Sequence, residues 1–201
     1  MTLTRRSTIA AALALPALGL PTLALAKAAP AFSVKDIDGR LRSLSEFKGK
    51  VVVLEWVNEG CPYVKKHYSG NMQGLQVSAV RDGAVWLTIC SSAKGEQGHW
   101  SDAAAARSWM TARSWAGTAV LIDEDGKVGK AYGAKTTPHM YVIDKAGMLV
   151  YQGGIDDVPT NKVEDIKRAK NLVAAALADV NAGRPVATPF SQPYGCAVKY
   201  A

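Results

Sequence analysis

Two nearly continuous apolar runs constrain the fold of this chain more than any other feature of its sequence. Residues 51–57 and 84–90 are each the length of one strand and carry apolar side chains at almost every position. This pattern is typical of strands buried on both faces of a parallel sheet. Pro62 follows the first run and favours the start of a helix, which we expect to be interrupted near Ser69 and Gly70. Strand, helix and strand form a βαβ unit, so we expect a sheet covered by helices.

The remaining segments extend this unit into one α/β domain. In chain order we expect a strand-turn-strand entry at 34–44, a helix at 101–113 capped by Ser101-Asp102, a strand at 119–123, a short helix at 127–132, a hairpin of 140–144 and 148–152, and an amphipathic helix through 163–180. We predict a central mixed β-sheet with helices on both faces over residues 27–182. Residues 183–201 then form an extended C-terminal tail.

The first 26 residues have the pattern of a signal peptide. Arg5 and Arg6 precede an uncharged stretch that ends in the small-x-small triplet Ala24-Leu25-Ala26. We therefore expect export by the Sec or twin-arginine route to the periplasm or the exterior, with no stable membrane anchor. The formal net charge of +7 falls to +5 without the two signal arginines, and because the remaining basic residues are scattered, nothing indicates nucleic-acid binding.

Cys61 lies at the corner between the first apolar run and the helix that Pro62 opens. Unpaired backbone N–H groups and the positive end of the helix dipole favour a thiolate at such a corner. Lys65, one turn along the helix, adds positive charge that further tunes the thiolate. We predict that Cys61 is a nucleophile, and a buried structural cysteine is the alternative interpretation.

Three segments of the sequence resemble the thioredoxin-like redoxins. They are Glu55-Trp56 with Gly60-Cys61-Pro62-Tyr63-Val64-Lys65, then Thr136-Thr137-Pro138-His139-Met140-Tyr141, and the closing Pro193-Tyr194-Gly195-Cys196. More narrowly they resemble the exported peroxiredoxin-like group of the alkyl hydroperoxide reductase and thiol-specific antioxidant family. The resemblance covers the chain from about residue 32 to the C-terminus and implies a thioredoxin-like fold.

This resemblance implies roles for individual residues. Cys61 takes the place of the first cysteine of the thioredoxin CxxC pair, whereas Val64 occupies the second place. Thr137-Pro138 resembles the family's cis-proline loop, which implies that substrate backbone docks there opposite Cys61. The peroxidatic pattern Pro-x-x-x-Thr-x-x-Cys is not matched, because Leu54 and Asn58 occupy its proline and threonine positions.

The other cysteines and the histidines complete the set of candidate residues. Cys196 in the tail is the candidate resolving thiol or disulfide partner of Cys61, and whether such a disulfide is catalytic or structural stays open. Cys90 ends the second apolar run and is expected in the core. His139 follows Pro138 and is expected to face Cys61 and tune its thiolate, while His67 is expected on a helix surface and His99 in a loop. No CxxxC spacing is present, so we predict no metal site and no cofactor.

These features favour a thiol-disulfide oxidoreductase in which Cys61 attacks and Cys196 resolves. Its partners are a disulfide- or peroxide-bearing substrate and a thiol electron donor. Two alternatives stay open. One is a thiol peroxidase with Cys61 as the peroxidatic residue, and the other is a non-catalytic redoxin that binds a metal or a protein partner.

Overall fold

The computed structural model describes residues 27–201. The predicted signal peptide at residues 1–26, and the export that it implies, lie outside the described residues. In the described part, no helix is both long enough and apolar enough to cross a membrane.

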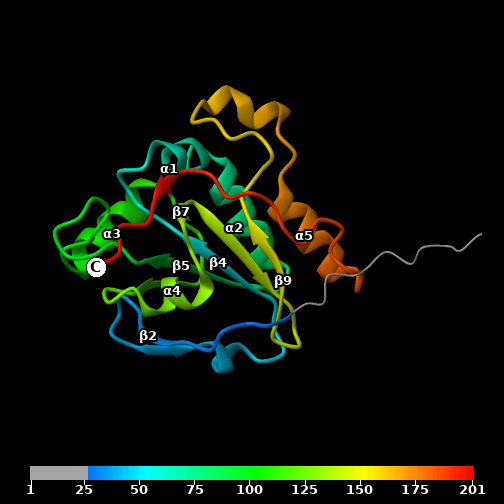
Figure 1. The fold of residues 1–201 in the computed structure, drawn as a ribbon, viewed down its shortest axis with the longest axis horizontal. Helices are drawn as coiled ribbons and strands as arrows, with labels where there is room; N and C mark the ends of the chain where they lie inside the picture. Colours follow the sequence, from blue (N-terminus) through cyan, green and yellow to red (C-terminus); the bar gives the residue numbers. More distant parts are fainter. Residues whose placement is uncertain (1–26) are drawn as a thin grey trace, which may run out of the picture.

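A six-stranded mixed sheet forms the centre of the molecule, in the order β1-β9-β8-β4-β5-β6 (Figure 1). β4, β5 and β6 run parallel, whereas β8 is antiparallel to both β4 and β9. The apolar run that follows residue 51 forms β4, which lies between β8 and β5, so that its side chains are buried on both faces. The six strands are β1 (Lys27–Ala28), β4 (Val52–Trp56), β5 (Val85–Cys90), β6 (Ala119–Ile122), β8 (His139–Ile143) and β9 (Met148–Gly153).

Two further antiparallel pairs lie outside the main sheet. β2 (Ser33–Lys35) pairs with β3 (Leu41–Ser43), as expected for a strand-turn-strand entry. β10 (Cys196–Ala197) pairs with β7 (Thr136–Thr137), which joins the end of the chain to the segment before β8.

Helices cover both faces of the sheet. On one face, α2, α3 and α5 contribute Met72, Trp109 and Val173 to one apolar cluster. On the other face, α4 contributes Val128 and Tyr132 to a second cluster, and Figure 1 shows α4 and β2 on the side of the sheet opposite α1. The helices are α1 (Pro62–His67), α2 (Asn71–Arg81), α3 (Ala103–Ala112), α4 (Lys127–Tyr132) and α5 (Leu172–Asn181), with 3₁₀ turns η1 (Leu44–Phe47) and η2 (Val163–Arg168).

The fold predicted from the sequence is confirmed, except at one helix. The helix after Pro62 ends at His67 and a new one begins at Asn71, so the predicted interruption is present. The predicted continuous helix through 163–180 is wrong: the chain is extended at Ala169, after η2, and α5 begins only at Leu172. Asn171 terminates the irregular segment because its side chain accepts a hydrogen bond from the N–H of Ala174 at 2.9 Å and so caps α5.

Candidate functional site

Cys61 occupies the N-cap of α1, at the corner that follows β4. The preceding Asn58 shapes this corner: its Oδ1 accepts from the N–H of Gly60 at 2.9 Å, and its carbonyl accepts from the N–H of Cys61 at 3.1 Å. Its amide also donates to the carbonyl of Gln97 at 3.0 Å. Asn58 therefore holds the corner in an Asx turn. The sequence prediction treated Asn58 only as a missing threonine, although Asn two residues before Gly is itself a turn signal.

The loop before β8 places a backbone carbonyl beside the thiol of Cys61. Its Thr137-Pro138 peptide bond is cis, as the sequence predicts. The Sγ of Cys61 lies 3.0 Å from the carbonyl oxygen of Thr137, to which the thiol donates. Cys61 itself has no exposed surface. Cys61, the predicted nucleophile, is thus in direct contact with the predicted substrate-docking loop, but its thiol does not reach the solvent.

Cys196 is brought to the same place by β10. In the antiparallel ladder Cys196 lies opposite Thr137, and the Thr137 hydroxyl donates to the Cys196 carbonyl at 3.4 Å. Gly195 permits this approach, because its φ is 137° and a Cβ there would lie 2.0 Å from the Thr137 carbonyl oxygen. The ladder puts Cys196 against Cys61, and both are free thiols in this structure.

The two thiols have opposite acidity. Burial by itself raises the pKa of Cys61, but hydrogen bonds from the Cys196 thiol, from the backbone of Val64 and Cys196 and from the side chain of Thr137 together more than offset it, so the pKa of Cys61 lies below its ordinary value. Burial, and then the hydrogen bond and charge of Cys61, raise the pKa of Cys196 to about 11. A proton shared by the pair therefore stays on Cys196, and Cys61 is the thiol that ionises first.

The structure places neither Lys65 nor His139 beside Cys61. Lys65 is exposed, since the buried side of α1 is formed by its neighbours. The side chain of His139 lies on the opposite face of the sheet from Cys61, where its ring centroid is 4.5 Å from that of Tyr141. The Nδ1 of His139 accepts from the N–H of Lys135 at 3.2 Å, and burial lowers the pKa of His139 to about 4. In the described residues, the groups that lower the pKa of Cys61 are instead the Cys196 thiol, the backbone of Val64 and Cys196, and the side chain of Thr137.

The remaining cysteine and histidines lie away from the thiol pair. Cys90 is buried at the end of β5, as predicted, and its thiol donates to the carbonyl of Gly98 at 3.2 Å. His99 is in a loop and is part-exposed. The expectation that His67 lies on a helix surface is wrong, because its side chain has no exposed area. Residues 27–201 contain no group of three His, Cys, Asp or Glu side chains that is arranged to hold a metal ion.

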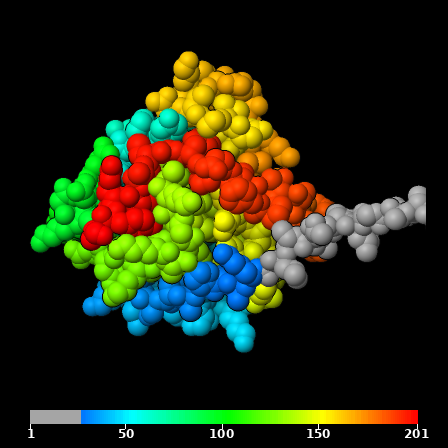
Figure 2. Space-filling view, in the orientation of Figure 1, coloured from blue at the N-terminus to red at the C-terminus, as the bar shows by residue number. Residues whose placement is uncertain are grey.

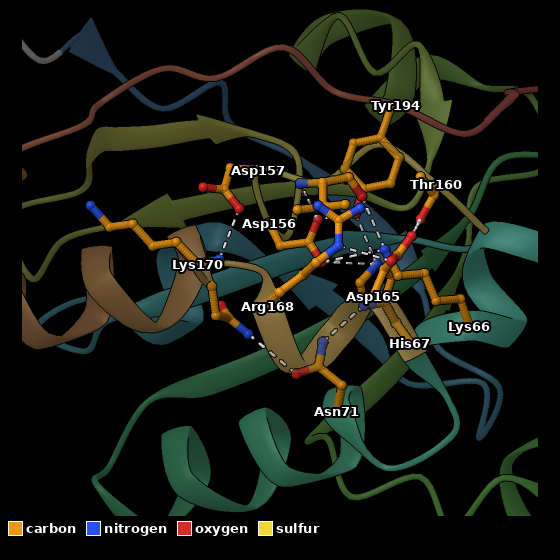
Figure 3. Close-up of polar contacts among 12 residues, drawn as sticks. Lys66, His67, Asn71, Asp156, Asp157, Thr160, Asp165, Arg168, Lys170 and Tyr194 are labelled. Atoms are coloured by element: carbon orange, nitrogen blue, oxygen red, sulfur yellow. Dashed lines mark hydrogen bonds and ion pairs between the residues drawn. The ribbon is translucent and has the colours of Figure 1, made fainter. Parts of the chain in front are cut away.

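His67 belongs to a buried polar cluster that sequence reasoning missed (Figure 3). The Nε2 of His67 lies 3.0 Å from the hydroxyl of Tyr194, and that hydroxyl donates in turn to the carboxylate of Asp156. Lys66 is also buried: its Nζ lies 3.5 Å from that carboxylate and 5.5 Å from the centre of the Tyr194 ring. Burial lowers the pKa of His67 to about 4. This Lys66–His67–Asp156–Tyr194 cluster fixes Tyr194, two residues before Cys196.

A second buried carboxylate lies on β4, between the sheet and α2. Glu55 has no exposed surface and accepts four hydrogen bonds, from Tyr68, Gln76, Trp86 and Thr88 at 2.7 to 3.1 Å. Burial raises the pKa of Glu55 above its ordinary value, and these donors oppose the rise. Glu55 thus ties β4, whose end positions Cys61, to α2 and β5.

Comparisons with known proteins place this chain in a family. Residues 25–152 match the AhpC/TSA family. The thiol-disulfide oxidoreductase ResA of Geobacillus thermodenitrificans is 27% identical over 135 residues, which cover 63% of this chain and 67% of that protein.

Two solved structures share the fold. One is a hypothetical protein from Sinorhizobium meliloti, with a TM-score of 0.71, 24% identity, and coverage of 90% of this chain and 96% of that chain. The other is a protein from Chlorobium tepidum described as a putative thiol:disulfide interchange protein DsbE, with a TM-score of 0.52, 21% identity, and coverage of 65% and 85%. The family match extends over more than half of the sequence and includes Cys61 and Thr137-Pro138. This chain is therefore a member of the AhpC/TSA family, with a thioredoxin-like fold.

Proposed function

We propose that this protein is an exported thiol-disulfide oxidoreductase whose redox couple is Cys61 and Cys196. The observation that carries the proposal is the ladder between β10 and β7, which sets Cys196 opposite Thr137, next to the thiol of Cys61. Two thiols held together in this way exchange readily between dithiol and disulfide. The relative ResA is named as a thiol-disulfide oxidoreductase, which supports the same chemistry.

The proposed reaction transfers two electrons between the protein and a partner. In the reducing direction the dithiol gives two electrons and two protons to a partner disulfide, which leaves as two thiols while a Cys61–Cys196 bond forms. Cys61 is the nucleophile that forms this bond because it is the more acidic thiol of the pair. A separate thiol donor returns the couple to the dithiol. We expect disulfides of exported proteins to be the substrates.

The test is a comparison of single-cysteine substitutions. The purified protein is oxidised with glutathione disulfide, digested with trypsin and analysed by mass spectrometry, and insulin reduction is measured in parallel. Peptides 51–65 and 171–199, which contain Cys61 and Cys196, are expected to be linked. Cys61→Ser and Cys196→Ser should abolish insulin reduction, whereas the matched control Cys90→Ser should retain it. Full activity of Cys61→Ser would contradict the proposal.

A thiol peroxidase is the second candidate, favoured by membership of the AhpC/TSA family. The side chain of Asn58 is already engaged with Gly60 and Gln97, so it does not replace the hydroxyl that would orient a peroxide at Cys61. We therefore expect slow peroxide consumption by the reduced protein. Consumption of hydrogen peroxide that is fast and lost in Cys61→Ser would make this second function the better one.

Export is a separate part of the proposal. We infer that residues 1–26 are removed and that the protein acts in the periplasm or outside the cell, where an oxidising environment supports disulfide chemistry. Amino-terminal sequencing of the protein from a fractionated bacterial host tests this inference. Intact protein that starts at Met1 and remains in the cytoplasm would contradict it.

A further inference from the structure

Of the two cysteines in the proposed couple, the more acidic one is the less accessible to solvent. Cys61, the more acidic, has no exposed surface. Cys196, the less acidic, is part-exposed. Thr137 and Cys196 contact the Sγ of Cys61. A partner sulfur that approaches from solvent therefore meets Cys196 before it meets Cys61.

The tail that carries Cys196 is held on both sides of this residue. On its amino-terminal side, the hydroxyl of Tyr194 bonds to Asp156 and His67 in the buried cluster. On its carboxyl-terminal side, three hydrogen bonds join the tail to the body of the protein: Val198 N–H to Lys135 O at 3.0 Å, Ala93 N–H to Lys199 O at 2.6 Å, and the Tyr200 hydroxyl to Ala134 O at 2.8 Å. Figure 2 shows the tail on the molecular surface, between segments from the middle of the chain.

The tail segment from Tyr194 to Tyr200, which we call the strap, also occupies the backbone edge next to Cys61. β10 is hydrogen-bonded to β7, and its residues Cys196 and Ala197 lie opposite Thr137 and Thr136. A peptide that formed an antiparallel ladder with the same edge of β7 would need the place that β10 fills. The expected docking of substrate backbone at Thr137-Pro138 is therefore blocked while the strap is closed. A substrate must therefore react with the Cys61–Cys196 couple without forming backbone hydrogen bonds to β7.

We propose that Cys196 is the residue that forms the mixed disulfide with an external thiol, and that Cys61 is the internal partner that leaves or attacks within the protein. This inference rests on the proposed function and specifies which sulfur meets the substrate. It reverses the order of events predicted from the sequence, in which Cys61 attacks the substrate and Cys196 resolves. Cys61 keeps the role of nucleophile, but its target is the Sγ of Cys196.

The chemical steps balance in both directions. When the protein acts as an oxidant, a partner thiolate attacks the Sγ of Cys196, the Cys61–Cys196 bond breaks, and its electron pair leaves on Cys61. A second partner thiol, deprotonated, then attacks the partner sulfur of the mixed disulfide, which releases the partner disulfide and leaves Cys196 as a thiol. The protons of the two partner thiols end on the dithiol couple. In the reducing direction Cys196 attacks the partner disulfide, and the Cys61 thiolate then attacks the Sγ of Cys196 and expels the partner thiolate.

The acidity of the pair supports attack at Cys196 by an external thiol. In thiol-disulfide exchange the thiol with the lower pKa leaves faster. Cys61 has the lowered pKa, because hydrogen bonds from Cys196 and from backbone N–H groups outweigh the effect of burial. Attack at the sulfur of Cys196 thus expels the better leaving group, and the accessible sulfur is also the chemically favoured site.

Mapping of the mixed disulfide tests the inference directly. Oxidised protein is exposed briefly to glutathione, quenched with acid, alkylated with N-ethylmaleimide and digested with trypsin. We expect glutathione on peptide 171–199 and N-ethylmaleimide on peptide 51–65. Glutathione on peptide 51–65 would overturn the inference and leave the proposed couple intact. If the two cysteines never form a disulfide, the proposed function fails, and this inference fails with it.

Single-cysteine variants supply a second measurement that does not depend on disulfide rearrangement. The folded Cys61→Ser variant retains Cys196, and Cys196→Ser retains Cys61 beneath the strap. Reaction with glutathione disulfide is expected to be at least about tenfold faster at Cys196 than at Cys61, because Cys61 reacts only when the strap opens. The difference should disappear in denaturant. Equal or faster reaction of Cys61 in the folded protein would refute the assignment.

Discussion

Acidification is expected to destabilise this protein through its buried histidines, and His139 offers the sharpest test. Its Nδ1 already accepts a hydrogen bond from the N–H of Lys135, so a proton added at Nδ1 would face another donor. Burial lowers the pKa of His139 to about 4, from an ordinary value of 6.5. Because the unfolded chain binds this proton more readily, stability is retained above pH 6.5 and lost as the pH falls toward 4.

The size of the effect follows from these two pKa values. A shift of about 2.5 pKa units corresponds to roughly 3.4 kcal/mol once the pH is below both values. At pH 5 the same calculation gives a loss of unfolding free energy of about 2 kcal/mol from His139 alone. His67 has a pKa lowered to about the same value by burial, so its contribution has the same sign and a similar size.

The assay is urea unfolding of the reduced protein at pH 7, 6 and 5, followed by tryptophan fluorescence. His139→Asn keeps an acceptor near Lys135 but cannot be protonated, so the loss of unfolding free energy between pH 7 and pH 5 should be smaller by about 2 kcal/mol than in the wild type. His99→Gln, a change at a part-exposed loop residue, is the matched control and should keep the wild-type pH dependence. An equal pH dependence in wild type and His139→Asn would refute the reasoning.

Three other changes test the strap and the buried carboxylate. Tyr194→Phe removes the hydroxyl that anchors the tail and should shift the thiol-disulfide equilibrium with glutathione toward the dithiol by up to about tenfold. Tyr63→Phe removes a hydroxyl that has no hydrogen-bond partner within residues 27–201, and it should not shift this equilibrium. Gly195→Ala introduces a Cβ against the backbone of β7 and should slow disulfide formation; Gly183→Ala, at a positive φ in open space, controls for strain alone. Burial raises the pKa of Glu55 above its ordinary value of 4.5, so the contribution of Glu55 to stability should be lost as the pH rises from that value. Glu55→Gln removes this contribution, so the unfolding free energy measured in urea should rise more steeply between pH 5 and pH 7 than in the wild type.

Local patterns in the sequence predicted most of the sheet and the position of Cys61 at the corner before α1. The apolar runs correspond to β4 and β5, and Pro62 marks the start of α1. The final helix was predicted wrongly because apolar spacing continues through 163–180, whereas Asn171 caps a new helix and ends the extended segment before it. Hydrophobic periodicity cannot reveal such a break, because the break depends on the capping side chain of one residue.

The parts of the site that depend on long-range contacts were less predictable. Cys61 at a strand-to-helix corner follows from neighbouring residues, but the position of Cys196 opposite Thr137 requires the whole tail to fold back. Lys66 and His67 were not predicted to be buried, since charged and polar residues on a six-residue helix are normally expected at the surface. Their partners, Asp156 and Tyr194, are far away in the sequence and become neighbours only in the folded chain.

The pairing of β10 with β7 also has a consequence for the unfolded chain. A bond between Cys61 and Cys196 would close a loop of 135 residues, which is most of the described chain. Such a cross-link lowers the conformational entropy of the unfolded chain and is worth about 5 kcal/mol in the chain-entropy model. Reduction of the couple would therefore change the whole molecule's resistance to heat and proteolysis. The redox state of the environment would therefore change how long the protein survives as well as how it reacts.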